Sequence, residues 1–276
     1  MNKIFSTIAS AFLIMAGCCL SSCDKENDSF KLTGIEGCPS ALLSNGRVTV
    51  SFAYSGNQFV RIHYPDGQTT HFNYENGTFS GISYTPPKDV ADGHGCNTFT
   101  RTGEDTYEVN STGEPALDLS HVDSIKLDAD GLPTRITFTG IYQQTEKGEE
   151  LVQEWGLYTL LTFDPATRLL VKQEVFDKDS NLRTTYTYEY DNASGSFSHT
   201  ELPIHLLGWL YYRYAGSHDF KTVQYLNRRH NIIKITEEDK ENGISTTTYT
   251  YKYNENHFPI AVSSNKWNGE EIEIKY

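Results

Sequence analysis

The stretch that decides the fold is TTTYTYKYNENHFPIAV, residues 246–262. Its three tyrosines alternate with Thr and Lys, so an extended strand would have one aromatic face and one polar face. Residues 254–257 supply a turn, and apolar residues alternate again over 258–262. The stretch therefore predicts an antiparallel hairpin with one buried face.

The same unit recurs along the chain. IKLDADGLPTRI (125–136) aligns with YKYNENHFPIAV (251–262), with a Lys and a Pro in register and Asp opposite Asn. Looser copies begin at Phe163-Asp164, Tyr190-Asp191 and Leu226-Asn227. Turn dipeptides such as Asn-Gly separate the other alternating stretches. We therefore expect an all-β fold, an antiparallel meander of hairpins that forms a curled sheet or a barrel.

The last alternating stretch is EIEIKY, residues 271–276. Ile272, Ile274 and Tyr276 share one face, and two Glu and one Lys share the other. Such alternation is typical of a strand with one buried and one wet face. We expect this strand to close a single cooperative β domain over residues 46–276.

Residues 1–22 have the pattern of an export signal. Lys3 precedes a largely apolar run over 4–20, and Leu20-Ser21-Ser22-Cys23 resembles the lipobox of bacterial lipoproteins. That resemblance implies that the signal peptide 1–22 is removed and that Cys23 is lipidated. An ordinary cleaved secretory signal is the alternative. Residues 23–45 are expected to be a polar tether.

The composition excludes some partners. The chain has 276 residues and a formal net charge of −13, a charge that repels nucleic acid and anionic lipid head groups. We therefore expect no nucleic-acid partner. The apolar fraction of 37% is low for a globular protein, so much of the sheet surface must face water.

Two cysteines, Cys38 and Cys96, remain outside the signal and lipobox. Disulfides form in the compartments outside the cytoplasm, so these two cysteines are predicted to pair with each other. The loop Asp92–Cys96 also contains His94, but four ligands at recurring spacings are lacking. We expect no metal site and no cofactor.

No sequence motif of a known catalytic class is present, including GxSxG, HExxH and the phosphate-binding loop. We therefore expect a protein that is not an enzyme. A hydrolase whose carboxylates come from separate strands stays open, because carboxylate separation is a spatial property.

The segment LPIHLLGWLYYRYAGSHDF, residues 202–220, interrupts the hairpins and is rich in apolar and aromatic residues. Large apolar segments usually pack inside, which makes this segment a candidate plug of the core. Alternatively it forms an aromatic ligand-binding platform made by Trp209, Tyr211, Tyr212 and Tyr214.

The chain resembles a family of uncharacterised Bacteroidota-type lipoproteins with a porin-like β fold, and its hairpins are similar to YD-type repeats. The matching stretches are Leu20–Cys23, Thr185–Asp191, Pro203–Tyr214 and Tyr249–Val262. The resemblance implies a lipoprotein of the outer membrane, exposed at the cell surface by the acidic run after Cys23. In enteric bacteria an Asp directly after this Cys implies retention at the inner membrane instead, so the membrane leaflet stays open. The resemblance supplies no catalytic or binding residues.

A porin-like fold need not form a pore. The face opposite the tyrosines carries Thr, Glu and Lys rather than the apolar band of a membrane barrel. We therefore expect a soluble barrel held by its lipid. Its expected function is non-catalytic binding of a glycan, a peptide or a partner lipoprotein. A structural or assembly role in the cell envelope is the alternative.

Overall fold

The computed structural model describes residues 35–86, 96–114, 119–145, 148–201 and 229–276. Within these ranges the regular structure is entirely strand. The strands are β1 (Ala41–Ser44), β2 (Arg47–Ser55), β3 (Gln58–His63), β4 (Thr69–Glu75), β5 (Thr78–Thr85), β6 (Cys96–Arg101), β7 (Thr106–Glu114), β8 (Leu119–Leu127), β9 (Pro133–Thr145), β10 (Gly148–Phe163), β11 (Leu170–Phe176), β12 (Leu182–Tyr190), β13 (Ile232–Asp239), β14 (Gly243–Tyr253), β15 (Pro259–Ser264) and β16 (Glu271–Lys275).

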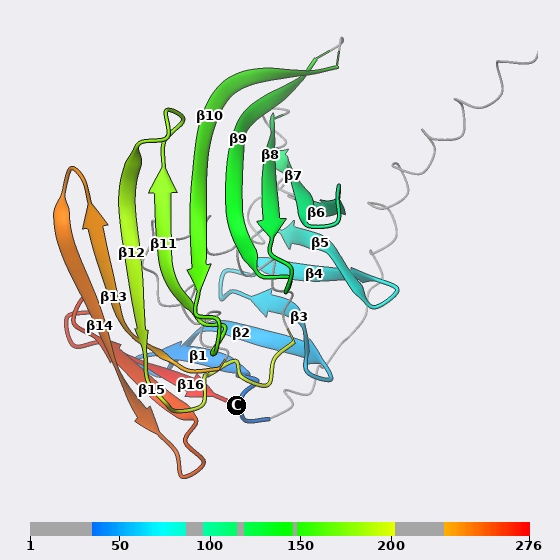
Figure 1. The fold of residues 1–276 in the computed structure, drawn as a ribbon. Coiled ribbons are helices and arrows are strands. Elements are labelled where there is room, and N and C mark those ends of the chain that lie inside the picture. Colours follow the sequence, from blue (N-terminus) through cyan, green and yellow to red (C-terminus); the bar gives the residue numbers. More distant parts are fainter. Residues whose placement is uncertain (1–34, 87–95, 115–118, 146–147, 202–228) are drawn as a thin grey trace, which may run out of the picture. The chain divides into compact units, whose positions relative to one another are not determined.

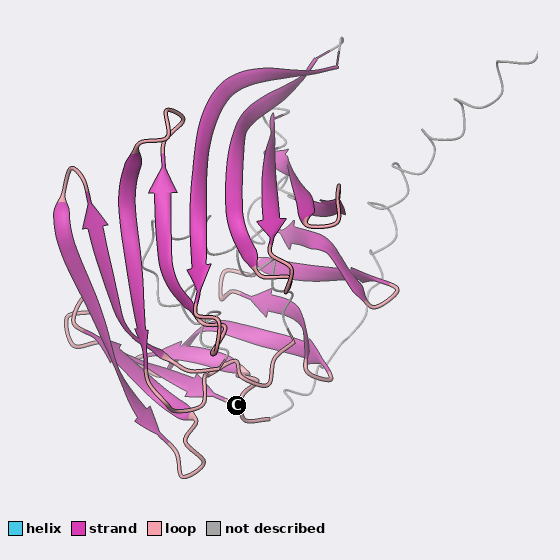
Figure 2. Cartoon of the chain, in the orientation of Figure 1, coloured by secondary structure: helices cyan, strands magenta, loops and turns pink. Residues whose placement is uncertain are grey.

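Every strand pairs with its neighbours in the chain, and β1 also pairs with β16, so the sheet closes into a barrel (Figures 1 and 2). All these pairings are antiparallel. The predicted all-β meander of hairpins is thus confirmed, and of the two predicted forms the chain adopts the barrel. Among the described residues there is no helix long and apolar enough to cross a membrane.

The predicted face assignments are also confirmed. Tyr186 and Tyr188 of β12 are buried inside the barrel, whereas Thr187 and Glu189 between and beside them are exposed. In β16 the two isoleucines are buried, and Ile274 lies opposite Leu42 of β1. The last strand therefore closes the domain, as the alternation of EIEIKY indicates.

The predicted start of the β domain at residue 46 is wrong. β1 lies within the expected tether, and Leu42 has no exposed surface. The backbone N–H of Ser40 donates to the carbonyl oxygen of Lys275 (2.6 Å), so the sheet bonding extends to residue 40. The strand escapes sequence analysis because it has four residues, too few to show alternation, and its partner β16 lies at the other end of the chain.

The Asp and Asn residues at the ends of these strands close the turns, and all but Asp239 directly follow an aromatic or Leu residue. In Asp128, Asp177 and Asn254 the side-chain Oδ1 accepts the backbone N–H groups of the residues two and four positions on, at 2.8 to 3.0 Å. Asp164 and Asp239 accept the N–H groups two and three positions on. These bonds explain the repeat, because a short side chain with an acceptor oxygen satisfies the turn's backbone donors.

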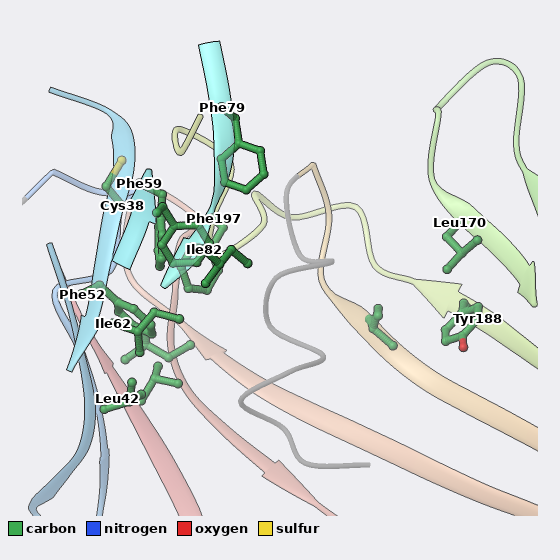
Figure 3. Close-up of a cluster of buried hydrophobic side chains, with 14 of the residues drawn as sticks. Cys38, Leu42, Phe52, Phe59, Ile62, Phe79, Ile82, Leu170, Tyr188 and Phe197 are labelled. Atoms are coloured by element: carbon green, nitrogen blue, oxygen red, sulfur yellow. The ribbon is translucent and has the colours of Figure 1, made fainter. Parts of the chain in front are cut away.

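A row of phenylalanines crosses β2 to β6 and fills one part of the barrel interior. The ring centroids of Phe59 and Phe72 are 4.8 Å apart, and those of Phe79 and Phe99 are 5.0 Å apart. Phe197, which lies outside the strands, packs edge-on against Phe52 with a centroid distance of 5.4 Å (Figure 3). We call residues 191–201, which carry Phe197, the plug segment, because Phe197 fills this part of the core. The predicted plug, residues 202–220, lies outside the described residues and stays a prediction.

Polar contacts hold the plug segment in place. Asp191 accepts the backbone N–H and the side-chain amide of Asn231, and the hydroxyl of Tyr253 donates to it as well. The other end is bonded to the N-terminal part of the domain, where the N–H of His199 donates to the carbonyl oxygen of Gly37 at 3.0 Å. Gly37 has a φ of +81° and a Cβ there would lie 2.7 Å from the His199 ring, so glycine is required.

A candidate ligand site inside the barrel

The inner side of the barrel is lined by phenylalanines on β2 to β6 and by more polar side chains on β10 to β14. Figure 3 shows Leu170 and Tyr188 on the wall opposite the phenylalanine row, which agrees with the position of β11 and β12 halfway around the barrel from β2 and β3. The register of β10 to β14 identifies which side chains face inward. Tyr186, which is buried inside, lies opposite Gln173 of β11 and Glu237 of β13.

Because facing residues on neighbouring strands share a face, the inward positions can be followed from strand to strand. Leu161 lies opposite Gln173, Val175 opposite Thr159, and Ile235 opposite both Tyr188 and Thr247. The inward face of these strands is unusually polar for a barrel interior. We call its polar and tyrosine residues the lumenal polar patch: Thr159, Gln173, Thr184, Tyr186, Tyr188, Glu237, Asp239, Thr247 and Tyr249.

Hydrogen bonds link members of the patch across the strands. The hydroxyl of Tyr188 donates to Gln173 Oε1 (3.3 Å), and the hydroxyl of Tyr186 donates to Glu237 Oε1 (3.2 Å). The hydroxyl of Thr184 donates to Asp239 Oδ2 (2.9 Å). The tyrosine hydroxyls are thereby oriented by fixed acceptors, as expected of a preorganised polar surface.

Two buried polar atoms of the patch lack a hydrogen-bond partner. They are Gln173 Nε2 and Thr159 Oγ1, and both residues have 0% exposed surface. Leaving such a group unpaired costs roughly 1–3 kcal/mol of folding stability. Buried polar groups in native proteins are nearly always paired, so two unpaired atoms on one inward face require an explanation.

Two pKa values in the patch are shifted, that of Tyr186 by burial and that of Asp239 by hydrogen bonds in the turn between β13 and β14. Burial, and next the charge of Glu237, raises the pKa of the Tyr186 hydroxyl, which therefore stays protonated and donates. The backbone N–H of Asn242, and next the Thr184 hydroxyl, lowers the pKa of the Asp239 carboxyl. Both groups thus keep their donor and acceptor roles across the neutral pH range.

The patch contains two carboxylates and no cation. Among the described residues of β10 to β14, the lysines lie on the outer face, where they pair with acids. These ion pairs are Lys172–Glu174 (2.6 Å), Lys234–Glu189 (2.7 Å) and Lys252–Glu271 (2.5 Å). Cationic groups are therefore segregated from the interior of this wall.

Sequence reasoning missed Gln173 and Thr159. The sequence does place both polar residues on apolar strand faces. Gln173 shares the face of Val171 and Val175, and Thr159 shares the face of Leu161. A polar residue on the apolar face of a strand marks a position where local pattern and global fold disagree, and such positions are often functional.

The predicted site residues lie elsewhere. The platform residues Trp209, Tyr211, Tyr212 and Tyr214 and the lipidation residue Cys23 are outside the described residues, so both hypotheses stay predictions. The described part of the chain contains no group of three or more His, Cys, Asp or Glu side chains arranged to hold a metal ion.

In the structure Cys38 is a buried free thiol, and the hydroxyl of Thr200 lies 3.6 Å from its Sγ. Burial raises the pKa of this thiol. The side chain of Cys96, in β6, is outside the described residues, so its pairing with Cys38 stays a prediction. Thiol labelling of the unfolded, unreduced chain tests it. Labelling of both residues would support the free-thiol state, and labelling of neither the disulfide.

The hydrolase hypothesis requires carboxylates on separate strands. The two acids of the lumenal polar patch, Glu237 and Asp239, both come from β13, and each accepts a hydrogen bond from a neighbouring hydroxyl. The patch therefore does not supply the pair that this hypothesis requires.

Comparisons with known proteins leave the family open. No family model matches the chain, and no curated protein matches it. Among solved structures, a porin-like protein from Bacteroides uniformis is similar over 75% of this chain and 90% of its own length, with 13% identity and a TM-score of 0.39. This similarity concerns the arrangement of the strands alone.

Proposed function

We propose that this chain is a non-catalytic binding lipoprotein whose ligand meets the partly exposed members of the lumenal polar patch. The observation that carries the proposal is that Tyr186 and Thr184 donate to the partly exposed carboxylates Glu237 and Asp239 on an inward strand face. A purely structural barrel would gain stability from apolar side chains on this inward face. Fixed polar groups that keep some exposed surface are what a polar ligand requires.

Exposure varies across the patch. Gln173 and Thr159 are fully buried, whereas Glu237 and Asp239 keep partly exposed side chains. Preformed sites usually combine a small number of fixed polar groups with a larger apolar lining. Here Leu161 and Ile235 supply buried apolar neighbours on the same face.

The proposed location is the outer membrane, at the cell surface, through a lipid on Cys23. The lipobox Leu20–Cys23 and the acidic run that follows it support this anchor. The outer face of β11 to β16 also supports it, because its Lys–Glu pairs suit water better than hydrocarbon. Several acyl chains hold a polar domain at a membrane durably, whereas one chain binds marginally.

Replacement of Cys23 by Ala is expected to move the protein from the membrane fraction to the soluble fraction. Intact-mass analysis of the wild-type chain should show acylation on an N-terminal Cys23. The Cys19→Ala variant is the matched control, since it changes a signal-peptide cysteine outside the lipobox, and it should stay membrane-bound. A fully soluble wild type, or a Cys23→Ala variant that stays in the membrane, would contradict the anchor.

Binding is tested with the whole lipidated chain in detergent, applied to arrays of glycans and peptides. The proposal expects at least one reproducible ligand, and the Trp209→Ala variant then shows whether the aromatic platform contributes. A loss of binding with an unchanged melting temperature would support the platform. A much lower melting temperature of Trp209→Ala would show that Trp209 packs in the core. Binding to no array component and to no partner lipoprotein would contradict the proposed function.

A further inference from the structure

We infer that the seam between β3 and β4 is an acid-sensitive switch in the barrel wall, which opens locally when His63 and His71 become positively charged. The switch is independent of the lumenal polar patch, because it lies on other strands of the barrel. Three features support it: the short pairing of the two strands, the basic side chains on its outer face, and the charges around them.

The β3–β4 seam is shorter than the seams beside it. Three residue pairs form it: Arg61 with His71, Ile62 with Thr70, and His63 with Thr69. The seam between β4 and β5 has seven pairs, and the seam between β2 and β3 has five. Local opening costs least where few contacts must break, so the β3–β4 seam should open before its neighbours do.

Two of the three pairs carry basic side chains on the outer face. The middle pair, Ile62 and Thr70, is buried, so the residues on either side of it face outward. Arg61 lies directly opposite His71, and His63 shares its face two residues along β3. Directly opposed like charges destabilise a sheet, and protonation of His71 would create such a pair.

The inner side of the seam is held by contacts that acid does not change. The rings of Phe59 and Phe72 pack edge-on with a centroid distance of 4.8 Å, and the hydroxyl of Tyr74 donates to the carbonyl oxygen of Phe59 at 2.8 Å. Burial, and next the charge of Glu201, raises the pKa of Tyr74 to about 12, so this hydroxyl stays neutral. The seam is therefore closed by these inner contacts, which repulsion on the outer face would oppose.

Both histidines are partly buried and favour their neutral forms. Burial, and next the charge of Arg61, lowers the pKa of His63, and the same two causes, followed by His63, lower the pKa of His71. Each ring lies near a threonine hydroxyl, His63 Nδ1 at 3.2 Å from Thr69 and His71 Nε2 at 3.1 Å from Thr85.

The direction of the pH effect follows from these lowered pKa values. Below the ordinary histidine value of 6.5, the closed seam binds fewer protons than the unfolded chain does. The stability of the seam is therefore complete above this pH and is lost as the pH falls through the lowered pKa values.

The other described side chains that face the two histidines carry no charge. They are Ser51 of β2, Thr69 and Asn73 of β4, and Ser83 and Thr85 of β5. Cys96 of β6 lies one strand further, opposite Ser83. Asp66, in the turn after β3, accepts the backbone N–H of Gln68 at 2.9 Å. Within the described ranges neither histidine forms an ion pair with a carboxylate that would offset its charge.

The test measures amide hydrogen-exchange protection, strand by strand, in the whole chain at about pH 7.5 and about pH 5.5, a range in which histidine is the side chain that titrates. Protection is expressed relative to the intrinsic exchange rate at each pH. The variants are His71→Gln and Arg61→Gln. Lys234→Gln is the matched control, since it removes an outer-face positive charge from β13, away from the seam.

We expect the protection of β3 and β4 amides in the wild type to fall at least about tenfold from neutral to acid pH, as a pKa shift of about one unit implies. The fall should be clearly smaller in His71→Gln, which cannot become charged there, and in Arg61→Gln, which lacks the opposed charge. Lys234→Gln should behave like the wild type.

Three results would overturn the switch. One is a wild type whose β3 and β4 amides keep their protection at acid pH. Another is an equal fall in the wild type, His71→Gln and Arg61→Gln. The third is a loss of protection that is uniform over all strands, which would mean that acid unfolds the whole barrel. None of these results bears on ligand binding, so the proposed function is tested separately.

Discussion

Deletion of residues 270–276 should abolish cooperative unfolding and cause aggregation. β16 pairs at four positions with β1 and at three with β15, so its loss opens the barrel at two edges. The deletion also removes the buried Ile272 and Ile274, each of which contributes about 1.5–3 kcal/mol through burial. Unpaired edges template intermolecular pairing, which is the expected route to aggregation. Thermal melting and size-exclusion chromatography measure both effects.

The matched control leaves the backbone of β16 in place. Glu273 and Lys275 form an exposed ion pair on the outer face of the strand (2.8 Å). Replacing both by Ala should cost less than about 1 kcal/mol, since exposed ion pairs contribute little. A truncated protein that melts like the wild type would show that β16 is not needed for closure.

Phe197→Ala should destabilise the protein by roughly 3–5 kcal/mol, the usual cost of removing a fully buried phenylalanine. Phe197 is 1% exposed, and its ring lies 5.4 Å from Phe52 and 6.3 Å from Phe59, measured between centroids. Its removal would leave a cavity between the plug segment and the phenylalanine row. The free energy of unfolding in denaturant measures the loss.

Phe176→Ala is the control for this prediction. Phe176 is only partly buried, and its ring stacks on Tyr158 with a centroid distance of 4.8 Å and an interplanar angle of 6°. A neighbouring arginine, Arg135, lies over the same tyrosine, 4.1 Å from its centroid. Phe176→Ala should lower the free energy of unfolding clearly less than Phe197→Ala does. Equal losses in the two variants would mean that the plug segment is not part of the core.

The sequence predicts the parts of this fold that depend on local pattern. Alternation over 246–262 identifies the hairpin, and the Asp or Asn of each unit identifies the turn, because the side chain bonds the backbone two to four residues on. The buried tyrosines of β12 follow from the same alternation. These features require no knowledge of distant partners.

Features that arise only when the barrel closes could not be predicted from the local sequence pattern. β1 is recognisable only through its pairing with β16, and Phe197 is a core residue only because its segment packs against β2 and β3. The lumenal polar patch depends on register across five strands, β10 to β14. Single polar residues on apolar faces, such as Gln173, were visible in the sequence, but their assembly on one wall was not.

The most direct test of the central claim is a crystal structure of the chain with the array ligand that binds most tightly. The account predicts polar atoms of that ligand within hydrogen-bond distance, about 2.7–3.2 Å, of the Glu237 or Asp239 carboxylate. A ligand bound on the outer face of the barrel would contradict it.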